Sequence, residues 1–165
     1  MKRFCIIALA ILALLVFLFI FHAHQTTDDL ERKIMASVDA VLEGEGACEI
    51  DLSMLATGFE WDTVSIFVAG NSAQIRSHLK IDPDISDGIV FSLAGQPVKV
   101  IMSTYQFPQD LPPRIGYSVK RSNAEDPYFV SFPFEHAKIQ ARKYISSDGS
   151  YRYLLYTGIS AADKE

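Results

Sequence analysis

The chain begins with an unbroken run of apolar residues. Phe4 to Phe21 holds 18 consecutive apolar side chains, which as a helix would span about 27 Å, close to the hydrocarbon thickness of a bilayer. Lys2 and Arg3 precede this run, and Asp28 and Asp29 follow it. Because flanking positive charge stays on the cytoplasmic side, we expect a single-pass anchor in a bacterial cytoplasmic membrane, with the N-terminus inside and the rest exported.

A cleaved secretory signal is the alternative interpretation of this run. Such signals usually carry an apolar stretch of about 7 to 15 residues and a small-x-small cleavage site. Here the run is longer, and the bulky Phe21 lies two positions before Ala23, where a small residue is needed. We therefore favour an uncleaved anchor. Both interpretations place the following domain on the extracytoplasmic side.

After the run, the pattern becomes that of an amphipathic helix over about 27–43. Thr26 and Thr27 can cap its start, and Gly44 and Gly46 end it. Its apolar side chains recur on one helical face, at Leu30, Ile34, Val38, Val41 and Leu42. We expect this face to pack on the exported domain, with pairing to a second copy of the chain as the alternative.

From Ala47 the apolar residues alternate, which is typical of half-buried strands. Further strands are expected over 61–68, 89–93, 98–102, 128–132, 137–145 and 151–157, with a short helix ending near Leu79 and a proline-rich loop over 105–113. Gly95-Gln96 and the Ser147–Gly149 segment suit hairpin turns. These elements predict the α+β class, as a transmembrane helix followed by one small domain of mainly antiparallel sheet with one or two packed helices.

The chain divides into four parts on this basis. Residues 1–25 form the cytoplasmic start and transmembrane signal-anchor, 26–46 the amphipathic helix, 47–160 the exported α+β domain and 161–165 a frayed tail. Without Lys2 and Arg3, 13 basic side chains face 20 acidic ones, a net charge of −7. We therefore expect no nucleic-acid partner, because such a domain repels phosphate backbones.

One segment resembles a pattern found in other proteins. The stretch Ile50 to Ser53, the segment Phe59-Glu60-Trp61-Asp62 and the strand Ile89 to Phe91 before Gly95 are similar to a pattern in small, uncharacterised bacterial envelope proteins. The resemblance covers about residues 48–102, with Phe-Glu-Trp-Asp as its distinctive part. It implies an envelope location and no particular activity.

The two carboxylates that flank the only tryptophan are the first candidates for chemistry. On a strand, Glu60 and Asp62 share one face about 7 Å apart, a spacing that suits a general acid and base. His136 is the third weak catalytic candidate, as a base positioned by Glu135. The structural alternative, which we favour, has Asp62 bonding the preceding turn at residues 57–58 while Trp61 fills the opposite, apolar face.

A basic stripe supplies the candidates for binding. Lys138, Gln140, Arg142 and Tyr144 share one face of a predicted strand, and such a face suits an acidic protein or a polar glycan. Tyr153 and Trp61 are added because aromatic residues are enriched at interfaces. A solvated sheet face is the commoner explanation of the same pattern.

We expect neither a metal nor a cofactor. Asp82, Asp84 and Asp87 lack the glycine and glutamate of a calcium loop, and the pair His22 and His24 is too small a ligand set for zinc. The lone exported thiol, Cys48, alternates with apolar residues and is interpreted as a small buried side chain.

The expected function is therefore non-enzymatic. A membrane-tethered domain that binds another envelope protein, as an accessory subunit or an immunity-type inhibitor, suits a chain without a nucleophile motif, metal set or phosphate loop. Two alternatives stay open: a tethered hydrolase that uses the carboxylates and His136, and a sensor or glycan-binding module.

Overall fold

The computed structural model describes residues 29–83, 86–103, 115–123 and 125–157. The expected anchor, the proline-rich loop over 105–113 and the tail 161–165 lie outside these ranges. Within the described ranges, neither helix is long and apolar enough to cross a membrane.

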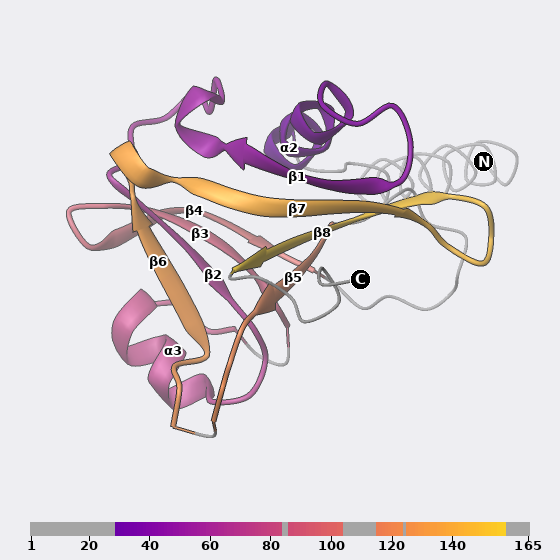
Figure 1. Cartoon of the computed structure of the whole chain (residues 1–165). Helices are drawn as coiled ribbons and strands as arrows, with labels where there is room; N and C mark the ends of the chain where they lie inside the picture. The colour runs from indigo at the N-terminus through magenta and orange to yellow at the C-terminus, as the bar shows by residue number, and fades with distance from the viewer. Residues whose placement is uncertain (1–28, 84–85, 104–114, 124, 158–165) are drawn as a thin grey trace, which may run out of the picture.

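Eight strands form two sheets of four, shown in Figure 1. Sheet A has the order β1 (Gly46–Asp51), β7 (Lys138–Ile145), β8 (Tyr151–Thr157) and β5 (Ile115–Val119). Sheet B has the order β4 (Gln96–Met102), β3 (Gly88–Leu93), β2 (Thr63–Phe67) and β6 (Phe129–Pro133). All neighbours pair antiparallel except β5 and β8, which are parallel. Together with two helices, these sheets make an α+β domain, as the sequence predicts.

The main core lies between the two sheets. Their facing sides, here called the inner faces, contribute fully buried residues such as Leu155 and Ile139 from sheet A and Val64 and Phe91 from sheet B. The alternation of strand side chains explains this arrangement, since every second residue of a strand faces the same side. The strands of sheet A cross those of sheet B obliquely in Figure 1.

Each helix covers a different surface. Helix α2 (Asp29–Asp39) packs on the inner face of sheet A beside β1 and β7, through Leu30, Ile34 and Val38. Helix α3 (Ser72–Leu79) covers the outer face of sheet B, where Ile75 packs with Phe67. The outer face of sheet A carries neither described helix.

Several features differ from the sequence-based expectation. Helix α2 ends at Asp39, short of the expected residue 43, and Val41, which was expected on its packing face, is 60% exposed. The structure has two sheets packed face to face, where a helix on one sheet was expected. Strand β5 was not predicted, although Ile115, Tyr117 and Val119 alternate, because its five residues follow a proline-rich stretch. The hairpin turn between β3 and β4 is Ala94-Gly95, one residue earlier than expected, and both residues have positive φ, at 50° and 70°. That geometry is typical of a type I′ turn.

Candidate functional site

The most elaborate polar network joins α2 to sheet A. Lys143 lies on the inner face of β7, with a side chain only 6% exposed, and its Nζ is 2.6 Å from Asp39 Oδ1 at the end of α2. The same ammonium donates to the backbone oxygen of Leu42 at 3.3 Å and lies 4.3 Å from the ring centre of Tyr151. The Tyr153 hydroxyl donates to both oxygens of Asp39, at 2.9 and 3.0 Å.

This network supports the fold and is poorly suited to catalysis. Burial and the neighbouring Asp39 raise the pKa of Tyr153 to about 12, so its hydroxyl keeps its proton at physiological pH. Lys143 is held by an ion pair and shielded from solvent, and a nucleophilic lysine needs a free amine instead. One signal in the sequence indicates that Lys143 points inward. In the predicted strand, Lys143 alternates on the same side as Ala141 and Ile145.

We predict that the Tyr153 hydroxyl ionises at an unusually high pH when the folded protein is titrated. Since its pKa rises from 10 to about 12 on folding, its stabilising effect is complete below pH 10. That effect is lost as the pH climbs towards 12. Tyrosinate absorbance should show one hydroxyl that ionises only near pH 12, and this step should disappear in Tyr153→Phe. An unchanged titration curve in that variant would contradict the assignment.

The Glu60-Trp61-Asp62 segment is mainly structural. Asp62 Oδ2 accepts a hydrogen bond from the Ala94 backbone nitrogen at 2.7 Å, so the carboxylate caps the β3–β4 hairpin. Its partner is thus a later hairpin and not the preceding turn at residues 57–58. Trp61 is buried, with its ring centre 5.1 Å from that of Phe91 and 4.7 Å from that of Phe134.

The three weak catalytic candidates do not form a site. Asp62 continues β2, which lies between β3 and β6, and its carboxylate points to the β3 hairpin. His136 lies beyond β6, in the short turn η2 (Phe134–His136). Glu60 and His136 are exposed, and neither forms a hydrogen bond or ion pair with another described residue. A hydrolytic role therefore finds no support in their arrangement.

The predicted basic stripe lies on the outer face of sheet A. The alternation of β7 places Lys138, Gln140, Arg142 and Tyr144 on the side opposite the buried Ile139, Ala141 and Lys143. Lys138 and Arg142 are exposed and form no ion pair with any described residue. Tyr144 is 41% exposed.

Neighbouring strands extend this surface, which we call the β7 face. Gln140 donates to Glu49 of β1 at 3.1 Å, and on β8 Arg152 pairs with Asp148 at 3.0 Å. Tyr156 is on the same side but is buried. The other two aromatic candidates for binding, Trp61 and Tyr153, are also buried and add nothing to the exposed surface.

Neither metal chemistry nor thiol chemistry is indicated among the described residues. No group of three or more His, Cys, Asp or Glu side chains comes together there in a way that could hold a metal ion. Cys48 is half-buried on β1 and packs against the main core. Burial raises the pKa of its thiol, which disfavours the reactive thiolate.

Among the residues that the structure describes, the β7 face exposes several of the candidate binding residues together. The resemblance to uncharacterised envelope proteins implies no particular activity for this face. No protein-family model, curated protein or solved structure matches this chain.

Proposed function

We propose that this chain is a single-pass membrane protein whose exported α+β domain binds another envelope protein through the β7 face. One observation carries the proposal: two cations and a tyrosine are exposed side by side on a sheet surface, and the cations have no ion pair within the described structure. The apolar run from Phe4 to Phe21 supports the tether, with the N-terminus in the cytoplasm and the domain on the periplasmic side.

The chemistry of the β7 face favours an acidic protein partner. Arginine and tyrosine are enriched among the residues that dominate binding energy. Lys138 and Arg142 lie on this face beside Glu49 and Asp51, and the domain carries a net charge of −7. An acidic partner is therefore attracted to the two cations and repelled elsewhere. The partner should therefore present carboxylates around an aromatic or apolar contact for Tyr144.

Anionic lipid is a weaker candidate for the same surface. Lipid-binding basic clusters usually hold about 4 to 8 cations, each worth about 1 kcal/mol. The β7 face has Lys138 and Arg142 unpaired, and its Arg152 is already neutralised by Asp148. The net negative charge of the domain opposes such lipids further.

Cross-linking in intact cells, followed by mass spectrometry, tests the proposal. Full-length protein should capture a protein partner, and the double variant Lys138→Glu, Arg142→Glu should lose most of that capture because it makes the patch repulsive. The matched control is Arg76→Glu with Lys80→Glu, which makes the same charge change at exposed positions on and just after α3, which covers the other sheet. Equal loss in both double variants, or no captured protein at all, would contradict the proposal.

Fractionation tests the tether separately. The protein should stay with membranes after an alkaline wash, and its N-terminus should precede the apolar run. A mature protein that begins near His24 and is recovered in the soluble periplasmic fraction would refute the anchor while leaving the β7 face untouched.

A further inference from the structure

Three large apolar side chains are exposed at one end of the sandwich. Met54 is 81% exposed, and Leu93 and Phe134 are each 39% exposed. We call these three residues the apolar rim. Large apolar side chains that gather on a surface commonly mark a contact with a membrane or another protein.

The fold brings these three residues together from separate segments. The short turn η1 (Leu52–Met54), which ends in Met54, lies against η2, which begins with Phe134. The Trp61 ring packs at a tilt against Phe134, and the backbone nitrogen of Phe134 donates to the backbone oxygen of Asp62 at 2.8 Å. Asp62 also caps the hairpin that carries Leu93. The rim is therefore built around the Trp61-Asp62 segment.

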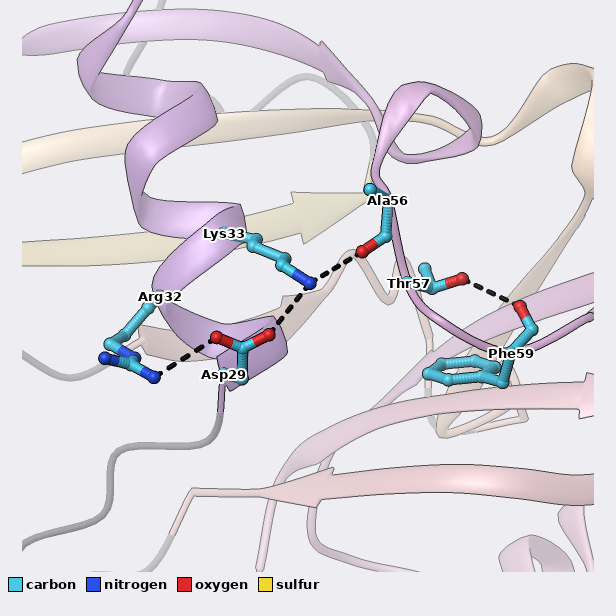
Figure 2. A network of polar contacts seen from close by, with 6 residues as sticks. All are labelled: Asp29, Arg32, Lys33, Ala56, Thr57 and Phe59. Atoms are coloured by element: carbon cyan, nitrogen blue, oxygen red, sulfur yellow. Dashed lines mark hydrogen bonds and ion pairs between the residues drawn. The ribbon is translucent and has the colours of Figure 1, made fainter.

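The rim lies next to the point where the chain leaves the domain towards its N-terminus. Figure 2 shows Lys33 of α2 bridging two groups, Asp29 at 2.8 Å and the backbone oxygen of Ala56 at 2.7 Å. Ala56 follows Met54 by two residues in the same loop. The first turn of α2 is thus fastened to the loop that bears the most exposed residue of the rim.

The remaining chain between domain and apolar run is short. Residues 22–28 separate Phe21 from Asp29, and even fully extended they reach at most about 28 Å. A domain of about 130 residues has a radius of gyration of roughly 14 Å. The end of the domain around Asp29 and Met54 is consequently held within reach of the lipid.

We infer that the apolar rim rests on the membrane interface, in contact with neutral phospholipid. Burial of methionine, leucine and phenylalanine side chains at the boundary between headgroups and acyl chains is favourable. Glu60 and Glu135 are exposed in the same segments and disfavour anionic headgroups. This inference rests on the tether of the proposed function and is independent of the β7 face.

The only tryptophan of the chain provides the test, because Trp61 lies directly beneath Phe134. Full-length protein is reconstituted into vesicles of phosphatidylcholine and into vesicles of the same lipid brominated on its acyl chains. Bromine quenches tryptophan only at short range. We expect a loss of Trp61 emission in the brominated vesicles, and recovery of that emission in Met54→Asp and in Leu93→Asp.

Val41→Asp is the matched control, since Val41 is 60% exposed beyond the other end of α2. This variant should keep the quenching. Equal emission in both lipids, from protein that survives an alkaline wash, would overturn the inference and leave the tether standing. Release of the protein by that wash would instead refute the tether. A third outcome would also overturn the inference. If Trp61 emission is not quenched in the wild type and Met54→Asp loses a cross-linked protein partner, the rim binds protein and not lipid.

Discussion

Replacing Asp39 with alanine is expected to destabilise the domain by about 3 kcal/mol, because it leaves the ammonium of Lys143 buried without its counter-charge. The side chain of Lys143 is 6% exposed and that of Asp39 is 44% exposed. The expected cost is therefore at the lower end of the range for a buried pair. The change also removes the acceptor of the Tyr153 hydroxyl. Urea unfolding of the full-length protein in mild detergent, followed by the emission of buried Trp61, measures the effect.

A double-mutant cycle separates the ion pair from simple packing. The variant Asp39→Leu, Lys143→Met replaces the pair by apolar side chains of similar size and should recover most of the lost stability. Asp39→Asn, which retains an acceptor for Tyr153, should fall between the wild type and the alanine variant. If the double variant is as unstable as the sum of its single variants, the pair does not act as the structure indicates.

Gly88→Ala should lower the free energy of unfolding by a similar amount, about 3 kcal/mol, for a steric reason. A Cβ atom at this position would collide with the backbone oxygen of Ile101 on β4 and would lie 2.6 Å from Cζ of the fully buried Phe67. A strand carbonyl cannot move away without breaking the β3–β4 ladder. The same urea titration reports the loss.

Gly116→Ala is the comparison for that variant. Gly116 also lies within a strand, but an added Cβ would be 3.5 Å from Leu154 Cδ1, an ordinary van der Waals contact. Alanine there should leave stability unchanged or raise it by up to about 1 kcal/mol, since glycine in a strand loses more backbone freedom on folding. Equal destabilisation at both glycines would show that the clash at Gly88 is relieved by movement.

Both effects concern residues that hold the sheets and α2 in place, and they bear on the proposed surfaces indirectly. The Lys143 network fixes the far end of α2, and the Lys33 bridge fixes its first turn. Helix α2 is therefore fastened to the rest of the domain at both of its ends.

Much of the local structure could be predicted from periodicity alone. The alternation in 137–145 predicted both the strand β7 and the common face of Lys138 and Arg142. The predicted end of the short helix near Leu79 likewise agrees with α3. Such patterns succeed because they depend on neighbours a few residues apart, and the spacing of side chains on a strand or helix is fixed by the backbone.

The partners of these faces were decided only by the tertiary structure. Alternation shows that Lys143 points inward, but it does not show that Asp39, about a hundred residues earlier, meets it there. It also does not reveal that β5 joins β8 in parallel or that Asp62 caps the hairpin at Ala94. Period-two patterns distinguish inside from outside, whereas the choice of partner depends on long-range packing of the whole chain. The sequence by itself therefore determined most of the elements and their faces, with β5 as the exception, and the fold determined which of those faces were left exposed.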